Sequence, residues 1–173
     1  MSEIINRVAS SKLKTFDLEE LYVAGVRTQI DISQWLFEGL ILREKDFRAA
    51  LMSHDWSQYK NHLVALYCST DAIVPSWAYM LVSLHLQDFV KKVVKGNLQD
   101  LELVLYTEKI TQLDLSTYTD LPVIVKGCSN KPVPESAYLL LIEKLQPVVK
   151  SIMYGEACSS VPLFKKSRKA KLA

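Results

Sequence analysis

From residue 62 onward, short apolar runs alternate with longer segments whose apolar residues recur every three or four positions. A short apolar run predicts a strand that is buried on both faces, and the longer spacing predicts a helix. The predicted strands are at 63–68, 91–96, 121–128 and 149–155. The predicted helices are at 76–89, 98–113 and 135–147. This alternation predicts an α/β fold with a mainly parallel sheet covered by helices.

The first 60 residues follow a different pattern. Residues 12–21 and 27–36 show partial polar–apolar alternation on either side of a short turn, which predicts a two-stranded β-ribbon. Residues 42–54 have helical spacing. We therefore expect a single domain with three parts, which are an N-terminal ribbon and helix (1–60), a core of duplicated βαβ units (61–162) and a basic tail (163–173).

The predicted core contains an internal repeat. When residues 63–96 are laid over 123–155 with one gap opposite Asp71, twelve of the 33 aligned pairs are identical. Typical residue frequencies would give about two. The alignment pairs Cys68 with Cys128, and it predicts a duplicated βαβ unit. Coincidence, helped by similar composition and by the choice of gap, is the alternative.

All three cysteines begin a similar phrase, Cys-Ser followed by Val-Pro after a short spacer. Cys68 and Cys128 follow predicted strands and precede predicted helices, so both are expected at the carboxyl edge of the sheet, where ligands bind in open α/β folds. Cys158 follows the fourth predicted strand and is expected at the same edge. If a helix instead continued to Tyr154, Cys158 would lie at the opposite edge.

Three thiols at one edge could hold zinc, iron or an iron–sulfur cluster, because adjacent strands are about 4.8 Å apart. Their spacings match no zinc-finger or ferredoxin pattern, so the prediction rests on the expected architecture alone. Candidates for a further ligand are Asp71 in the Cys68 loop, Glu156 before Cys158, and His54 in an apparent loop. His62 is expected at the start of a strand, away from the edge where the thiols are expected. His85 is expected within a helix among apolar residues, where a histidine is more often part of the core than a ligand.

The charge and composition limit the partners. A net charge of +2 is too small to predict a nucleic-acid partner, and five basic residues within 165–171 are typical of a solvated tail. No apolar run is long enough for a secretory signal or a membrane span. We therefore expect the cytoplasm, where thiols stay reduced. Partners could be other proteins or further copies of the chain.

Two other functions fit the same residues. Free cysteines are often inert and buried, which would suit a non-catalytic interaction domain. A helix N-terminus after Pro75 or Pro134 would lower the pKa of a nearby thiol, which would suit a thiol-dependent enzyme. The sequence has no glycine-rich phosphate loop and no nucleophile elbow, so whether the chain is an enzyme stays open.

Four stretches carry a resemblance to a known family: "DISQWLFEGLILREKDFRAAL", "CSTDAIVPSWAYMLV", "KGCSNKPVPESAY" and "KLQPVVKSIMYGEACSSVPLFKK". They resemble a bacterial family, found mainly in the Bacteroidetes, known as domain-of-unknown-function family 2480. The resemblance covers nearly the whole chain up to the basic tail. It implies no activity and no catalytic residue, and it favours iron or cluster handling over zinc.

Overall fold

The structure is a computed structural model that describes residues 12–127, 130–156 and 158–167. The chain divides into two compact units. Unit 1 comprises residues 1–22 and 105–173, and unit 2 comprises residues 23–104. These boundaries do not coincide with the one expected after residue 60. Unit 2 is inserted into unit 1 as one continuous segment.

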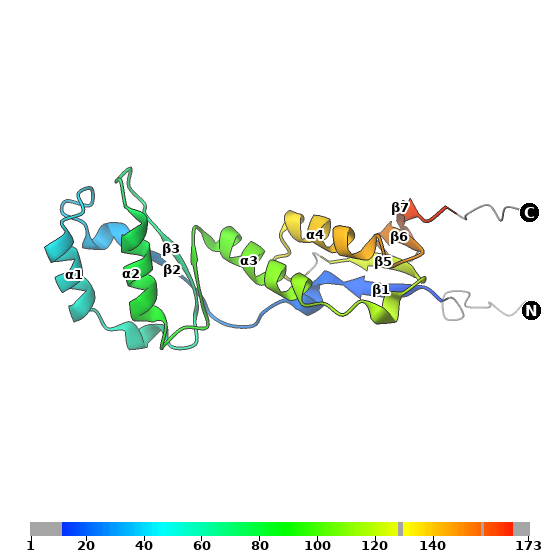
Figure 1. The fold of residues 1–173 in the computed structure, drawn as a ribbon, viewed down its shortest axis with the longest axis horizontal. Coiled ribbons are helices and arrows are strands. Elements are labelled where there is room, and N and C mark those ends of the chain that lie inside the picture. The colour runs from blue at the N-terminus through cyan, green and yellow to red at the C-terminus, as the bar shows by residue number, and fades with distance from the viewer. Residues whose placement is uncertain (1–11, 128–129, 157, 168–173) are drawn as a thin grey trace, which may run out of the picture. The chain divides into compact units, whose positions relative to one another are not determined.

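Unit 2 is a three-stranded parallel sheet in the order β2-β3-β4 (Figure 1). Its elements are, in chain order, β2 (Arg27–Asp31), the 3₁₀ helix η2 (Ile32–Trp35), α1 (Glu44–Ser53), η3 (Trp56–Tyr59), β3 (Leu63–Tyr67), α2 (Ser76–Leu86) and β4 (Lys92–Lys95). The first four residues of β3 are buried, as expected for a central strand covered on both faces. Phe47 and Leu51, one turn apart on α1, pack into the same core as Val82 of α2.

Unit 1 contains a four-stranded sheet in the order β1-β5-β6-β7. Its elements are β1 (Lys14–Asp17), η1 (Leu18–Leu21), η4 (Ser116–Tyr118), β5 (Pro122–Lys126), α4 (Glu135–Leu145), β6 (Ser151–Tyr154) and β7 (Val161–Lys165). β1, β5 and β6 are parallel, and β7 runs antiparallel to β6. The helix α3 (Leu98–Thr111) crosses the boundary between the units, and its second half packs on the unit 1 core through Tyr106 and Ile110.

The fold class is the predicted one, mixed α/β with mostly parallel strands. The predicted ribbon is wrong, because β1 pairs with β5 and β2 pairs with β3 in a different sheet. The polar–apolar alternation of these two segments fits an edge strand of a parallel sheet as well as it fits a hairpin. The strand β7 was not predicted either.

The two units repeat one fold, and the repeat is longer than the sequence predicted. Each runs from a strand through a 3₁₀ helix, a helix, a 3₁₀ helix and a strand to a further helix and strand, after which unit 1 adds β7. From Asp55 to Gly96, every residue matches the one 59 positions later, so that Asp55 matches Asp114 and Gly96 matches Gly155. Fourteen of these 42 pairs are identical, and no gap is needed.

Hydrogen bonds fix this alignment. Gly96 donates its N–H to the carbonyl of Leu66 (2.8 Å), and Gly155 donates to Val125 (3.0 Å). Leu66 therefore matches Val125. The positions that follow pair Cys68 with Gly127, which corrects the predicted match of Cys68 with Cys128. The gap opposite Asp71 had shifted the strands by one residue, and Asp71 in fact matches Asn130.

Candidate functional site

The three cysteines do not end strands of one sheet. Cys68 follows β3 in unit 2, whereas Cys158 follows β6 in unit 1. The expectation of one shared sheet edge is therefore wrong, although β6 is a strand as predicted. Cys68 is half-buried, with its Sγ 3.4 Å from Thr70 Oγ1, and Cys158 is exposed. Cys128 lies outside the described residues.

The other proposed ligands are also distributed over both units. Asp71 is exposed in the loop after β3, and Glu156 lines a pocket of unit 1. His54 ends α1 and lies among aromatic rings, 4.5 Å from the Trp56 ring centroid. Its Nε2 is 3.2 Å from Tyr59 Oη. Among the described residues, no three His, Cys, Asp or Glu side chains are grouped so that they could hold a metal ion. Metal binding through the three thiols stays a prediction.

The carboxyl ends of β1, β5 and β6 in unit 1 surround a polar pocket of about 260 Å³. Its charged walls come from Asp17, Glu19, Lys126 and Glu156. The Lys126 ammonium lies 3.3 Å from the Asp17 carboxylate. The hydrogen bond that Lys126 donates to Asp17, together with the negative charges of Asp17 and Glu156, raises the pKa of Lys126 above its ordinary value. Glu19 accepts a hydrogen bond of 3.0 Å from the Asn130 N–H. Several of the charged groups of this pocket thus already have partners within the unit.

The same edge of unit 2 is closed by a network around Asp31. One oxygen of Asp31 accepts hydrogen bonds from the N–H groups of Ser33 (2.9 Å) and Ser69 (3.1 Å). The other accepts from the Ser69 hydroxyl. Partial burial raises the pKa of Asp31, but the hydrogen bonds from Ser69 and Ser33 outweigh it and hold the pKa below its ordinary value. This network ties the start of η2 to the loop that follows β3.

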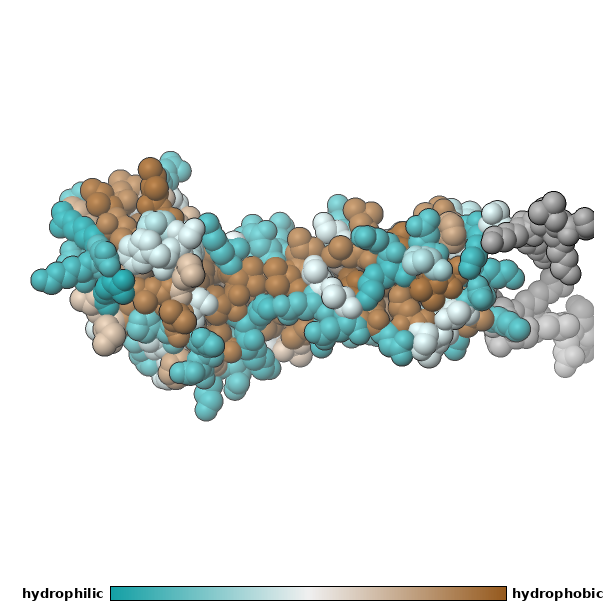
Figure 2. Space-filling view, in the orientation of Figure 1, coloured by the Kyte–Doolittle hydropathy of each residue, from teal (hydrophilic) through white to brown (hydrophobic). Residues whose placement is uncertain are grey.

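Beyond this network, two loops and the start of α2 form an open apolar groove of about 720 Å³. Its apolar lining includes Leu40, Ile41, Ala72, Ile73, Pro75 and Trp77. Ile73 is 93% exposed, and Leu40 and Ile41 are 54% exposed each. In Figure 2 the two loops appear as brown patches at the upper left. Monomeric proteins rarely expose contiguous apolar surface of this kind unless it binds something.

The sequence does not predict this groove. In the sequence, Ile73 is a spacer residue between Cys-Ser and Val-Pro. Leu40 and Ile41 lie between the predicted strand at 27–36 and the predicted helix at 42–54. The available signal is a group of three apolar residues within five positions (Phe37, Leu40 and Ile41) that lie outside any predicted helix or strand.

Comparison with known proteins gives a family but no activity. Neither a curated protein nor a solved structure matches the chain. No helix among the described residues is long and apolar enough to cross a membrane. A family model matches residues 2–166, nearly the whole chain. The chain therefore belongs to the family described as protein of unknown function, DUF2480.

Proposed function

We propose that the chain is a non-catalytic interaction domain that binds a segment of a partner protein in the apolar groove of unit 2. The observation that carries the proposal is the 93% exposure of Ile73 beside Leu40 and Ile41 in a concave site. Removing such side chains from water contributes roughly 25 cal/mol per Å² of apolar surface. A partner that covers them gains this free energy.

The groove is held in shape by hydrogen bonds between its two loops. Thr70 donates its hydroxyl to the Gly39 carbonyl (2.6 Å) and so joins the two loops. Within the first loop, Phe37 and Ile41 form an antiparallel bridge. Ser69 is fixed by Asp31 at the base of the second loop. A site that is ordered before binding loses less conformational entropy when a partner arrives.

The second copy of the fold indicates that the apolar groove is not needed for folding. At the positions of Ile73 and Trp77, unit 1 has Pro132 and Ser136. Unit 1 nevertheless forms the same strand–helix–strand arrangement. Trp77 also packs against Phe47 in the core of unit 2, but Ile73 has no structural requirement that would explain its exposure.

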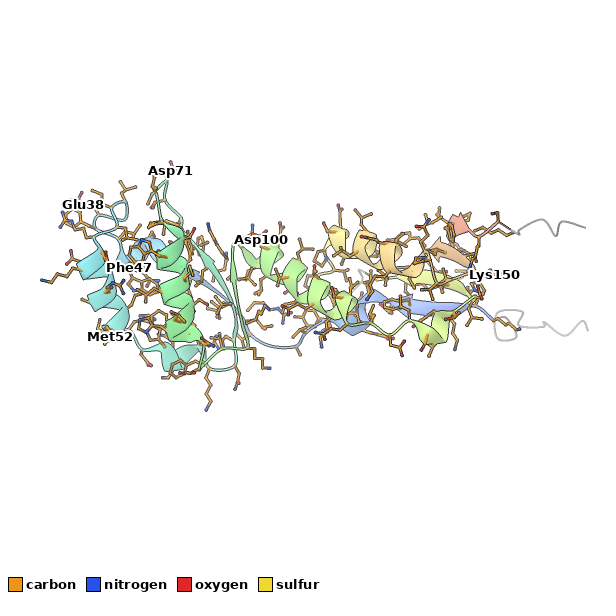
Figure 3. The ribbon with its side chains drawn as sticks, in the orientation of Figure 1. Glu38, Phe47, Met52, Asp71, Asp100 and Lys150 are labelled. Atoms are coloured by element: carbon orange, nitrogen blue, oxygen red, sulfur yellow. The ribbon has the colours of Figure 1, made fainter. Side chains whose placement is uncertain are left out.

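The charges beside the groove specify the chemistry of the partner. Glu44 is paired with Arg48 (2.9 Å), and the Arg43 guanidinium lies over the Phe37 ring. Asp71, in the groove lining, has no cationic partner among the described residues. Figure 3 labels Asp71 at the tip of its loop. We expect a partner segment with an aliphatic anchor next to a lysine or arginine.

Selection from a displayed library of random peptides tests the proposal. Peptides selected on the purified chain are expected to share an aliphatic residue beside a basic one. The Ile73→Asp variant is expected to lose their binding, and Asp71→Lys to reverse the preference for basic residues. Val26→Asp is the control, because Val26 is 57% exposed but lies before β2.

Two results would overturn the proposal. One is a set of selected peptides that binds Ile73→Asp as well as the unaltered chain. The other is a concentration-dependent dimer in light-scattering measurements that Ile73→Asp abolishes, because the groove would then hold a second copy of the chain.

A further inference from the structure

We infer that the partner segment is an amphipathic α-helix that lies along α2, with basic residues near both of its ends. This inference rests on the proposed function and specifies the shape of the bound segment. The apolar surface of unit 2 extends beyond the groove. It continues along one side of α2.

Trp77, which lines the groove, is followed three and seven residues later by Met80 and Leu84. Residues at this spacing lie on the same side of a helix. Met80 and Leu84 are each 65% exposed. The opposite side of α2 supplies the core residues Ala78 and Val82, which are fully buried. α2 therefore has a second apolar stripe, in which Met80 and Leu84 are exposed. Trp77 is half-buried, because its ring packs edge-on against Phe47 of α1.

The length of the stripe suits a helix. α2 has eleven residues, which corresponds to about 16 Å at 1.5 Å per residue. A partner helix of about three turns spans the same length and presents anchors at i, i+4 and i+7. Its first anchor would contact the groove at Trp77, and its last would contact Leu84, because these two residues are also seven positions apart on a helix.

Two carboxylates mark the ends of the stripe. Asp71 precedes α2 by five residues, and Asp88 follows it by two. Both are exposed, and neither has a salt-bridge partner among the described residues. A helix that carries lysine or arginine near both ends complements these charges at the rim, where they set orientation more than affinity.

The matching helix of unit 1 provides a built-in comparison. On α4, Ser136, Leu139 and Glu143 stand where α2 has Trp77, Met80 and Leu84. Two of the three positions are polar in that copy, so the fold does not require the stripe. Leu139 is 73% exposed, and it provides a matched control for Met80.

The test uses the full chain and a synthetic amphipathic peptide of about fifteen residues, with leucines at i, i+4 and i+7 and lysines near both ends. A second peptide has the same composition with proline at its centre. We expect the first peptide to bind and to gain helical circular dichroism on binding, and the proline peptide to bind at least tenfold more weakly. Met80→Asp and Leu84→Asp are expected to weaken binding of the first peptide tenfold or more, and Leu139→Asp to leave it unchanged.

The failures of the two proposals are distinguishable. If Ile73→Asp abolishes binding while Met80→Asp and Leu84→Asp do not, the groove binds a segment in another conformation and the helix inference is wrong. If the proline peptide binds as tightly as the first peptide, the helix inference is likewise wrong. If neither peptide binds the unaltered chain, the helix inference is also wrong. If, in addition, the selected library peptides ignore Ile73→Asp, the proposed function fails as well.

Discussion

Gly127 in unit 1 and Cys68 in unit 2 occupy the same position, one residue past the matching strands β5 and β3. Gly127 has a φ of +151°, and a Cβ placed there would lie 3.0 Å from Tyr138 Oη and 3.1 Å from the Leu18 side chain. Unit 2 accommodates a cysteine side chain at this position. The thiol of Cys68 therefore belongs to one copy of the duplication and was not inherited by both.

The first prediction concerns this glycine. Gly127→Ala is expected to destabilise unit 1 by roughly 1 to 3 kcal/mol, because alanine would be strained at this φ and its Cβ would be crowded. Hydrogen exchange at the amides of β5 and β6 measures the change. Cys68→Ala, at the matching position, is the control and is expected to cost less. An unchanged exchange rate in Gly127→Ala would contradict the strain argument.

The second prediction concerns a buried ion pair in unit 2. Arg27 contacts Glu102 through Nε–Oε1 (2.6 Å) and Nη2–Oε2 (3.2 Å), and only 13% and 9% of the two side chains are exposed. Glu102→Leu alone removes the carboxylate that balances the charge of this buried guanidinium, and it is expected to destabilise unit 2 by about 3 kcal/mol. Arg27→Met together with Glu102→Leu is expected to restore most of this loss.

Tryptophan fluorescence during urea unfolding measures the effect, because all three tryptophans (Trp35, Trp56 and Trp77) lie in unit 2. The exposed pair of Glu44 and Arg48 is the control. Its removal by Glu44→Gln is expected to change the unfolding free energy by less than about 1 kcal/mol. A double variant as unstable as Glu102→Leu would contradict this account of the pair.

The third prediction concerns the acid sensitivity of unit 2. The hydrogen bonds from Ser69 and Ser33 hold the pKa of Asp31 below its ordinary value of 3.8. The stabilisation from the ionised carboxylate is therefore present above the unfolded pKa, complete by about pH 5, and lost as the pH falls through the folded pKa. Carboxyl NMR titration of Asp31 is expected to give a midpoint below 3.8, and Ser69→Ala should move it upward. A midpoint unaffected by Ser69→Ala would show that other groups set it.

The helices and strands could be predicted because their patterns are local. The apolar run of β3 and the spacing of Phe47 and Leu51 each lie within one element. The sheets could not be predicted, because strand pairing depends on distant residues. The partner of Phe16 in β1 is Val125, more than 100 residues away, across the inserted unit.

The candidate site was missed for a related reason. Cysteines suggest chemistry, whereas Ile73 and Leu40 resemble ordinary core residues until their exposure is known. A single gap in the repeat alignment also places Cys68 opposite Cys128, and the hydrogen bonds of Gly96 and Gly155 show the true register. Thus the sequence could indicate a duplication, but it could not indicate which surfaces the two copies leave uncovered.

The fourth prediction separates the thiols. Cys158 is exposed, whereas Cys68 is half-buried beside Thr70. Limited alkylation followed by mass spectrometry is expected to modify Cys158 faster than Cys68, because access limits the reaction. A metal held jointly by the thiols would instead protect both until a chelator is added. Equal protection of the two, released together by a chelator, would favour the metal hypothesis over the interaction domain.

The last prediction concerns the stripe on α2. Leu84→Glu is expected to change the unfolding free energy of unit 2 by less than about 0.5 kcal/mol, because Leu84 is 65% exposed and glutamate forms helices well. Glu143 already stands at the matching position of α4. Val82→Glu, on the buried side of α2, is expected to unfold the unit by placing a charge in its core. Urea titration followed by tryptophan fluorescence compares the two variants. A loss of several kcal/mol in Leu84→Glu would mean that the stripe is covered within the chain itself, and no surface would remain for a partner helix.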